Sequence, residues 1–176
     1  MSDKTGTRGF DPHALLENLA DKRPRAIPKE IEPEGSDEEA CPAFGFVRGT
    51  RDKALMLELR FRNGNREWYP YSLLGPCKYN PSVGILLKFA GDTVNLVLIR
   101  GSNLDAFVNQ GTVNLTDRGI QRHRVLWVRE MDEDELRRAP RNEPTIDGIE
   151  VGEFESHETQ HEWLGAIAPV FLRSIE

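Results

Sequence analysis

The sequence predicts an α+β protein that is mainly antiparallel β: a curved sheet or small β-barrel capped by a C-terminal helix. Three observations lead to this fold class. Apolar and polar residues alternate with a period of two in several short segments. Turn-forming residues separate these segments, so consecutive strands are expected to pair as hairpins. The last long apolar pattern, over residues 156–174, has helical spacing instead.

Residues 54–62 form the clearest predicted strand, because apolar and polar side chains alternate there. One side of it carries Leu55, Leu57, Leu59 and Phe61. The turn Asn63-Gly64-Asn65 follows, with residues that tolerate positive φ. The chain is expected to return in a second strand over 66–74, where Pro70 favours an edge position or a bulge.

The most hydrophobic stretch, residues 83–100, predicts a second hairpin that turns at Gly91-Asp92. Its return strand is apolar on both faces, which indicates a central position in the sheet. A short helix is expected over 102–110, then a loop over 111–121 and a strand over 123–130.

Residues 132–138 place acids first and arginines last, as a short polar helix favours. A strand over 146–154 and the final helix follow, and Pro169 is expected to disturb that helix. Short connections and the lack of repeated βαβ units indicate antiparallel pairing. An SH3- or Sm-like barrel and a PH-like sandwich both fit this order.

Residues 1–42 are predicted to be a largely disordered acidic arm, because prolines and a run of acids interrupt them. A short helix is expected at 12–21, capped by Asp11 with Pro12 at its first position. Its apolar face would consist of Phe10, Leu15, Leu16 and Leu19. This helix either docks on its own domain or folds on a partner. The arm would precede a single β-rich domain over 43–176.

The bulk composition argues for a cytoplasmic protein. The N-terminal residues lack the apolar segment of a signal peptide, and no apolar run has the length of a membrane span. The cysteines Cys41 and Cys77 have neither metal-ligand spacing nor the density of a disulfide scaffold, which fits a reducing compartment. We expect no cofactor, and no Walker sequence or nucleophile elbow is present.

The net charge of −6 is unevenly distributed. Residues 1–45 carry a net charge of −4, residues 46–130 carry +6 and residues 131–176 carry −8. A basic middle can attract partners that carry phosphate. The acidic flanks can equally well neutralise it within the molecule.

Basic and amide side chains of the middle region are the candidate nucleic-acid-binding residues. They are Arg60, Arg62, Arg66, Arg100, Asn103, Arg118, Arg122 and Arg124. The aromatic residues Trp68, Tyr69 and Tyr71 lie beside the first arginines in the sequence and could stack on bases. The alternative is that these aromatic side chains serve core and cross-strand packing.

The segment Ile99-Arg100-Gly101-Ser102-Asn103 resembles the second motif of the Sm family. In Sm and Sm-like proteins, the arginine and glycine of this motif help to form a uridine-binding pocket in a ring of subunits. The resemblance therefore implies RNA binding. In this sequence, however, the faint counterpart of the first motif falls on the same strand, around Asn95, whereas the family places the two motifs on different strands.

The string His157-Glu158-Thr159-Gln160-His161 matches the H-E-x-x-H zinc signature. Two histidines four residues apart on a helix can bind one Zn²⁺, and the glutamate can act as general base. Acidic residues surround the pair, and no histidine follows as a third ligand. On a helical projection both histidines point sideways or outward from the apolar stripe. We therefore interpret the string as the polar first turn of the final helix and expect no metal site.

The sequence favours a non-enzymatic protein-binding or adaptor module whose N-terminal arm carries a helical docking motif. The alternative is an RNA-binding module that uses the basic β-rich body. The third interpretation is a zinc-dependent hydrolase that uses His157, Glu158 and His161. The expected partner is another protein or RNA rather than a membrane, and the oligomeric state stays open.

Overall fold

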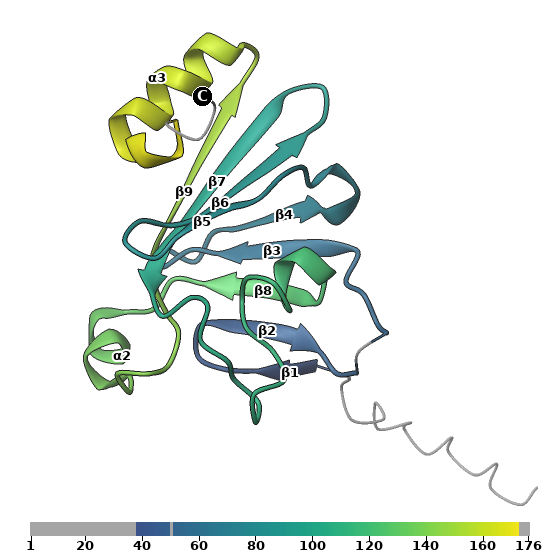
Figure 1. Ribbon diagram of the computed structural model, residues 1–176, viewed down its shortest axis with the longest axis vertical. Coiled ribbons are helices and arrows are strands. Elements are labelled where there is room, and N and C mark those ends of the chain that lie inside the picture. The colour runs from purple at the N-terminus through teal and green to yellow at the C-terminus, as the bar shows by residue number, and fades with distance from the viewer. Residues whose placement is uncertain (1–37, 50, 173–176) are drawn as a thin grey trace, which may run out of the picture. The chain divides into compact units, whose positions relative to one another are not determined.

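The computed structural model describes residues 38–49 and 51–172, which form two β-sheets with short helices around them (Figure 1). This confirms an α+β protein with mostly antiparallel pairing and a helix near the C-terminus. The predicted helix at 12–21, with Phe10 and the three leucines of its apolar face, lies outside the described residues.

The first sheet, sheet A, has five strands in the order β1-β2-β8-β3-β4. They are β1 (Glu38–Ala40), β2 (Phe44–Val47), β8 (Val125–Arg129), β3 (Met56–Arg60) and β4 (Arg66–Pro70). Neighbouring strands are antiparallel except β3 and β8, which run parallel. The hairpin β3–β4 and the edge position of β4 were both predicted.

The second sheet, sheet B, has four antiparallel strands in the order β5-β6-β7-β9. They are β5 (Lys78–Asn80), β6 (Gly84–Ala90), β7 (Val94–Ser102) and β9 (Thr145–Phe154). The central position predicted for the strand after Gly91 is confirmed, because β7 pairs on both sides and residues 96–99 are all buried.

The main core lies between the two sheets and takes side chains from both. It includes Phe44 and Phe46 of β2, Leu57 and Leu59 of β3, Val125 and Val128 of β8, Ile85, Leu87 and Phe89 of β6, and Val97 and Ile99 of β7. The sheets also touch through backbone contacts, since Leu74 bridges to Phe89 and Met131 donates to the Ile146 carbonyl over 2.8 Å. The strand pairing nevertheless gives two separate sheets. The closed barrel stays a prediction.

The helical elements are η1 (Tyr71–Leu73), η2 (Ile120–Arg122), α2 (Glu133–Arg138), α3 (His157–Ile167) and η3 (Pro169–Phe171). The helix α3 packs on the face of sheet B that points away from the main core. There Leu164, Ala168 and Phe171 join Leu86, Leu96 and Leu98 in a second apolar cluster. Figure 1 shows α3 beside the end of β9 and α2 near the other end of that strand. Within the described ranges, every helix is too short or too polar to cross a membrane.

The outer face of sheet A is built around one tryptophan. Trp127 of β8 is 8% exposed, and its indole N–H donates to the Glu38 carboxylate over 2.6 Å. Gly45 of β2 faces Trp127 across the strand pair, and any Cβ at position 45 would collide with the indole ring. The Arg60 guanidinium covers the ring at 4.3 Å. A glycine at position 45 therefore makes room for the bulky side chain opposite it.

Several sequence expectations differ from the structure. The strand β1 begins at Glu38, within the range 1–42 assigned to the arm. The helix expected over 102–110 is wrong: these residues end β7 and continue as turns, because Asn103, Asn109 and Gln110 all have positive φ. Leu55 is 83% exposed, since β3 starts only after it.

The C-terminal helix begins where expected but is shorter. Ser156 caps α3 by accepting a hydrogen bond from the Thr159 N–H. The helix was expected to run to residue 174, but α3 ends at Ile167 and η3 follows. Pro169 lies at the start of η3, as its missing backbone N–H favours.

Candidate functional site

A groove of about 430 Å³ opens between the start of α3 and the outer face of sheet B. We call it the α3 groove. Its helix side consists of His157, Gln160, His161 and Leu164. Its sheet side consists of Leu86, Lys88, Ala90 and Leu96, with Gly75, Pro76 and Lys78 at one edge. Ligand sites in proteins typically have a volume of about 300–1,000 Å³ and a mostly apolar lining.

The alternation of β6 and the packing of α3 explain why this groove exists. Ile85, Leu87 and Phe89 turn into the main core, so Leu86 and Lys88 point to the opposite face. Further along the helix, Leu164 and Ala168 seal the contact with the sheet. The lining also includes the small residues Gly75, Pro76 and Ala90, which fill little of the space between the sheet and the start of α3.

The sequence predicted that both histidines point sideways or outward from the apolar stripe, and His161 lies sideways with one edge of its ring buried. The buried residues of α3 are Gln160 and Leu164, so the inward face is centred closer to His161 than the apolar pattern indicated. His161 lies at the flank of this face, and its Nε2 atom is buried without a hydrogen-bond partner. The ring centroid of the exposed His157 lies 4.5 Å from the ring centroid of His161. Both histidines line the α3 groove.

The part of the chain that the structure describes brings no third metal ligand to the histidine pair. Within residues 38–49 and 51–172, no three His, Cys, Asp or Glu side chains come together in a way that could hold a metal ion. Glu158, the general base of the zinc signature, is exposed and does not line the groove. We therefore assign no metal chemistry to these residues.

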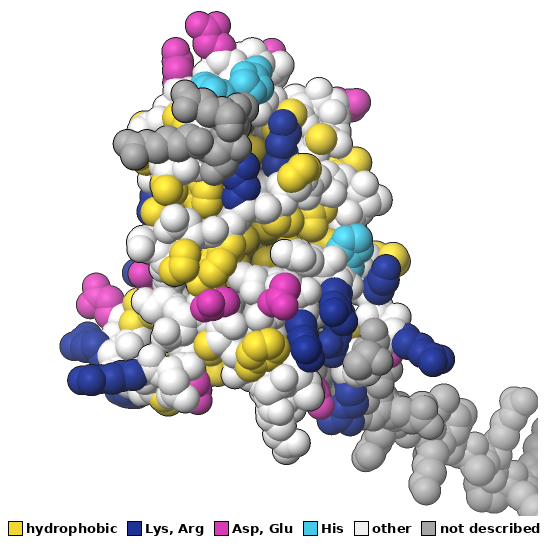
Figure 2. All heavy atoms as spheres, viewed as in Figure 1, with side chains coloured by type: hydrophobic (Ala, Val, Ile, Leu, Met, Phe, Trp, Pro, Cys, Tyr) yellow, Lys and Arg dark blue, Asp and Glu magenta, His cyan; other side chains and the backbone are white. Residues whose placement is uncertain are grey.

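The polar side chains around the α3 groove are neutral or positively charged. They are His157, His161, Gln160, Lys78 and Lys88, and among the described residues no carboxylate lines the groove. The Lys78 ammonium donates to the Phe171 carbonyl over 2.9 Å, which ties η3 to β5. Figure 2 shows histidine, lysine or arginine, and hydrophobic side chains close together at the α3 end of the body. This setting suits an apolar group that carries a negative charge.

We call the first group of predicted nucleic-acid-binding residues the hairpin arginines. They are Arg60, Arg62 and Arg66, and their side chains contact other residues of the fold. Glu58 binds Arg60 over 2.8 Å and Arg66 over 3.0 Å. Burial alone would raise the pKa of Glu58, but the hydrogen bond and charge of Arg60, helped by Arg66, hold it below its usual value. The charges of two hairpin arginines are therefore matched by a carboxylate on the same sheet.

Arg62 is held by two other segments. Its guanidinium donates to the Asp147 carbonyl over 3.0 Å, and its backbone N–H donates to the Glu130 carboxylate over 2.7 Å. A pocket of about 330 Å³ lies beside the hairpin arginines and also contains Arg129, Asp132 and Glu135. Its lining combines four arginines with the carboxylates of Glu130, Asp132 and Glu135, so most of the positive charge is balanced within the pocket.

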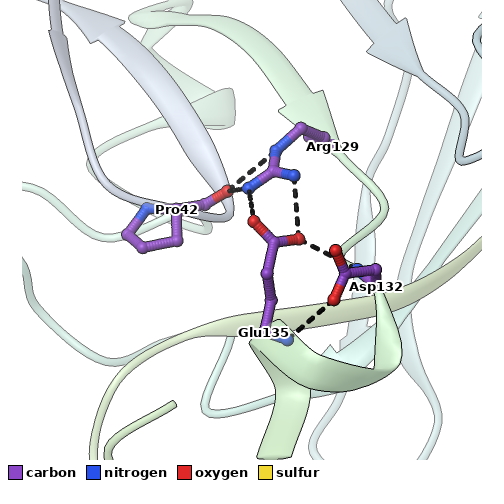
Figure 3. A network of polar contacts seen from close by, with 4 residues as sticks. All are labelled: Pro42, Arg129, Asp132 and Glu135. Carbon is purple, nitrogen blue, oxygen red and sulfur yellow. Dashed lines mark hydrogen bonds and ion pairs between the residues drawn. The ribbon is translucent and has the colours of Figure 1, made fainter. Parts of the chain in front are cut away.

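Arg129 at that pocket organises the start of α2 (Figure 3). It forms a two-pronged pair with the Glu135 carboxylate, with 2.8 and 2.9 Å contacts, and donates to the Pro42 carbonyl. Asp132 and Glu135 in turn form a capping box that closes the first turn of α2. The hydrogen bond from Arg129 lowers the pKa of Glu135. These contacts are structural.

Arg100 and Asn103, the residues of the Sm-like segment, also hold the fold together. Arg100 pairs with Glu150 over 2.6 Å and donates to the Ile167 carbonyl at the end of α3 over 2.7 Å. The Asn103 amide donates to the carbonyl groups of Arg141 and Glu143. A side chain at Gly101 would collide with the Thr145 carbonyl, which explains the glycine by close strand packing.

Arg118, Arg122 and Arg124, the remaining predicted residues, gather around η2. Arg124 is 7% exposed and donates to the Val47 carbonyl over 3.2 Å. Arg118 covers the ring of Phe107 at 5.3 Å. The loop before β3 joins this group, because the Ala54 N–H donates to the His123 carbonyl. We call Lys53, Phe107, Arg118, Arg122 and Arg124 the η2 corner.

Sequence reasoning found the histidines and the arginines but missed the other residues of the α3 groove. Lys78 and Lys88 belong to no motif, and Gln160 occupies a position of the H-E-x-x-H string that can be any residue. The available signal was the outward side of β6, where Leu86, Lys88 and Ala90 alternate with the core residues. No protein-family model, curated protein or solved structure matches the chain.

Proposed function

We propose that the protein is a non-enzymatic binding module and that the α3 groove receives a short segment of a partner protein. The observation that carries the proposal is the make-up of the groove. Its floor is apolar, through Leu86, Leu96 and Leu164, and the polar lining given by residues 38–49 and 51–172 contains two lysines and two histidines but no carboxylate. Such a surface favours an apolar anchor residue next to an acidic one.

The volume of the groove sets the size of the anchor. A space of about 430 Å³ accommodates one or two large apolar side chains but not a folded domain. Anchor residues of this kind supply most of the binding energy when they enter a preformed pocket. The occupant is therefore a linear segment with one aliphatic or aromatic anchor.

The polar groups of the groove explain the expected acidic neighbour. Lys88 stands between Leu86 and Ala90 on the sheet side. His161 lies opposite on α3, and its buried Nε2 atom lacks a partner. Buried polar groups are normally satisfied, so a carboxylate or amide of the bound segment that reaches Nε2 would remove this deficit.

The N-terminal segment with Phe10, Leu15, Leu16 and Leu19 is a second, separate part of the proposal, as a helical motif for a partner. Its test is a truncation that stops at Ser36, where the first unit of the chain ends. Removal of residues 1–42 would also delete β1, the Glu38 contact to Trp127 and the Pro42 carbonyl bound by Arg129. The shorter truncation keeps these contacts and so isolates the segment.

A random-peptide display selection on the full chain tests the α3 groove. We expect enriched peptides that place an aliphatic or aromatic residue beside Asp or Glu. Ala90→Trp fills the groove, so the same peptides are expected to bind it at least about tenfold more weakly. Ala166→Trp, on an exposed position of α3 outside the groove, is the matched control and retains binding.

Lys88→Glu tests the recognition of the acidic residue separately from that of the apolar anchor. We expect it to reduce the affinity for acidic peptides while peptides with Asn or Gln in place of the acid lose little. Peptides that bind Ala90→Trp as tightly as the unchanged protein would refute the groove as the site. A selection that enriches no apolar–acidic pattern would refute the proposed partner chemistry.

A further inference from the structure

The cations of the η2 corner form no ion pair in the described part of the chain. Within residues 38–49 and 51–172, Lys53, Arg118, Arg122 and Arg124 are unpaired in this sense, whereas Arg60 and Arg66 of the hairpin arginines are ion-paired. Lys53, Arg118 and Arg122 are exposed. Figure 2 shows Lys and Arg side chains grouped on the side of the body near η2 and the end of β2.

The acid beside Arg118 is held by other groups. Asp117 accepts hydrogen bonds from the Asn114 amide and the Thr116 hydroxyl. The hydrogen bond from Asn114 is the main reason why the pKa of Asp117 is lowered. Asp52, beside Lys53 in the loop, is exposed and forms no ion pair with a described residue. These two carboxylates leave an excess of positive charge at the η2 corner.

Arg124 adds a cation that is largely removed from water. Among the described residues its guanidinium has one hydrogen bond, to the Val47 carbonyl, and its buried Nε atom has none. A buried charge without a counter-ion is unfavourable, and an anion that binds nearby relieves that cost. The field of this group is weakly screened by solvent, so it supports anion binding by the exposed cations beside it.

Phe107 supplies an aromatic surface at the same place. Its side chain is 50% exposed, in a loop where Asn109 and Gln110 have positive φ. The Arg118 guanidinium lies 5.3 Å from the ring centre, so a cation and an aromatic ring are presented together. Exposed aromatic rings among cations bind unstacked bases in proteins that recognise single strands.

From this arrangement we propose that the η2 corner binds single-stranded nucleic acid: Lys53, Arg118 and Arg122 contact phosphates, and Phe107 stacks on a base. A single strand fits better than a duplex because only unpaired bases can offer a free face to Phe107. The interaction stays local, because the whole chain has a net charge of −6 and repels polyanions elsewhere. This surface shares no residue with the α3 groove.

Fluorescence anisotropy with labelled oligouridylate and oligothymidylate of about 12 nucleotides, a length that one such site can span, tests the proposal on the full chain. We expect binding that weakens steeply with salt. Arg118→Gln combined with Arg122→Gln is expected to weaken it at least about tenfold and to lower the salt slope by about one to two. Phe107→Ala is expected to weaken it about fivefold or more with an unchanged salt slope.

Arg60→Gln combined with Arg66→Gln is the matched control, because it removes the same charge from the hairpin arginines. It is expected to leave the affinity unchanged, and circular dichroism verifies that each variant is folded. Equal losses in both double variants would overturn the assignment to the η2 corner. Equal or tighter binding of a duplex of the same length, or of vesicles with anionic phospholipids, would overturn the single-strand assignment, as would no binding at all.

Discussion

The hairpin arginines and the arginines of the η2 corner lie in the same basic middle of the sequence, yet their surroundings differ. Arg60 and Arg66 share the carboxylate of Glu58, and Arg62 is held by Glu130 and Asp147. Arg118 rests on an aromatic ring, and among the described residues the buried Arg124 has only a backbone carbonyl as partner. Positive charge in a sequence therefore indicates a binding surface only where the fold does not pair it with an acid.

The largest difference in stability is expected between alanine variants of the two tryptophans beside Glu58. Trp127 and Trp68 both lie opposite Glu58 in sheet A, but Trp127 is 8% exposed and Trp68 is 56% exposed. Trp127→Ala is expected to lower the free energy of unfolding by about 3–5 kcal/mol, because it removes the packing against Gly45 and the contact with Arg60. Trp68→Ala is expected to change it by less than about 1 kcal/mol. Urea unfolding measures both, and similar losses would contradict the buried role of Trp127.

Removal of the acid that two hairpin arginines share is expected to have the next largest effect. Glu58→Gln leaves Arg60 and Arg66 without a counter-charge and is expected to destabilise the protein by about 1–3 kcal/mol at neutral pH. Because the folded-state pKa of Glu58 is lowered, its contribution is present above the ordinary carboxyl value of 4.5 and is lost as the pH falls below it. The free energy of unfolding is measured by urea titration at neutral pH and at about pH 3. Its difference between these two pH values is expected to be smaller for the variant than for the unchanged protein.

Arg124 allows a test in the opposite direction. Arg124→Met removes a buried cation that has no carboxylate partner, and it keeps a side chain of similar length. We expect the free energy of unfolding to stay within about 1 kcal/mol or to rise. A loss of about 3 kcal/mol or more in thermal or urea unfolding would show that Arg124 is paired in the fold and does not contribute free charge to the η2 corner.

The smallest effect is expected for the exposed arginines of the η2 corner. Arg122→Gln breaks no ion pair with a described residue, so the free energy of unfolding is expected to change by less than about 0.5 kcal/mol. Arg66→Gln, at an exposed but ion-paired position, is expected to lose up to about 1 kcal/mol. A larger loss for Arg122→Gln than for Arg66→Gln would reverse the comparison.

Local patterns in the sequence predicted the hairpins β3–β4 and β6–β7, the strands β8 and β9, and the starts of α2 and α3. They could do so because alternation, turn residues and helix caps are encoded by neighbouring positions. The strands β1, β2 and β5 were missed, since each has only three or four residues and is defined by its partner strand. The parallel pairing of β3 with β8 joins segments too far apart in the sequence for any local pattern to indicate it.

In the candidate sites, too, the sequence predicted the local features but not the contacts between distant segments. The sequence identified the arginines but not their pairing, because Glu58 reaches Arg66 only through the hairpin register. The burial of one edge of His161 was not predicted, because the buried face of α3 contains Gln160, a polar residue to which the apolar pattern gives no weight. Neither Lys53 nor Phe107 was associated with the arginines near η2, since a loop contact from Ala54 to His123 and the ring contact of Phe107 with Arg118 place them there.

The contact between Gly45 and Trp127 limits which substitutions homologues can accept at these two positions. Every side chain larger than hydrogen at position 45 collides with the indole, so neither position can change by itself without damage to the sheet. Homologues are therefore expected to keep the pair or to exchange both members, a larger residue at 45 appearing together with a smaller one at 127. Such paired exchange would mark distant relatives even where the arginines and histidines have been replaced.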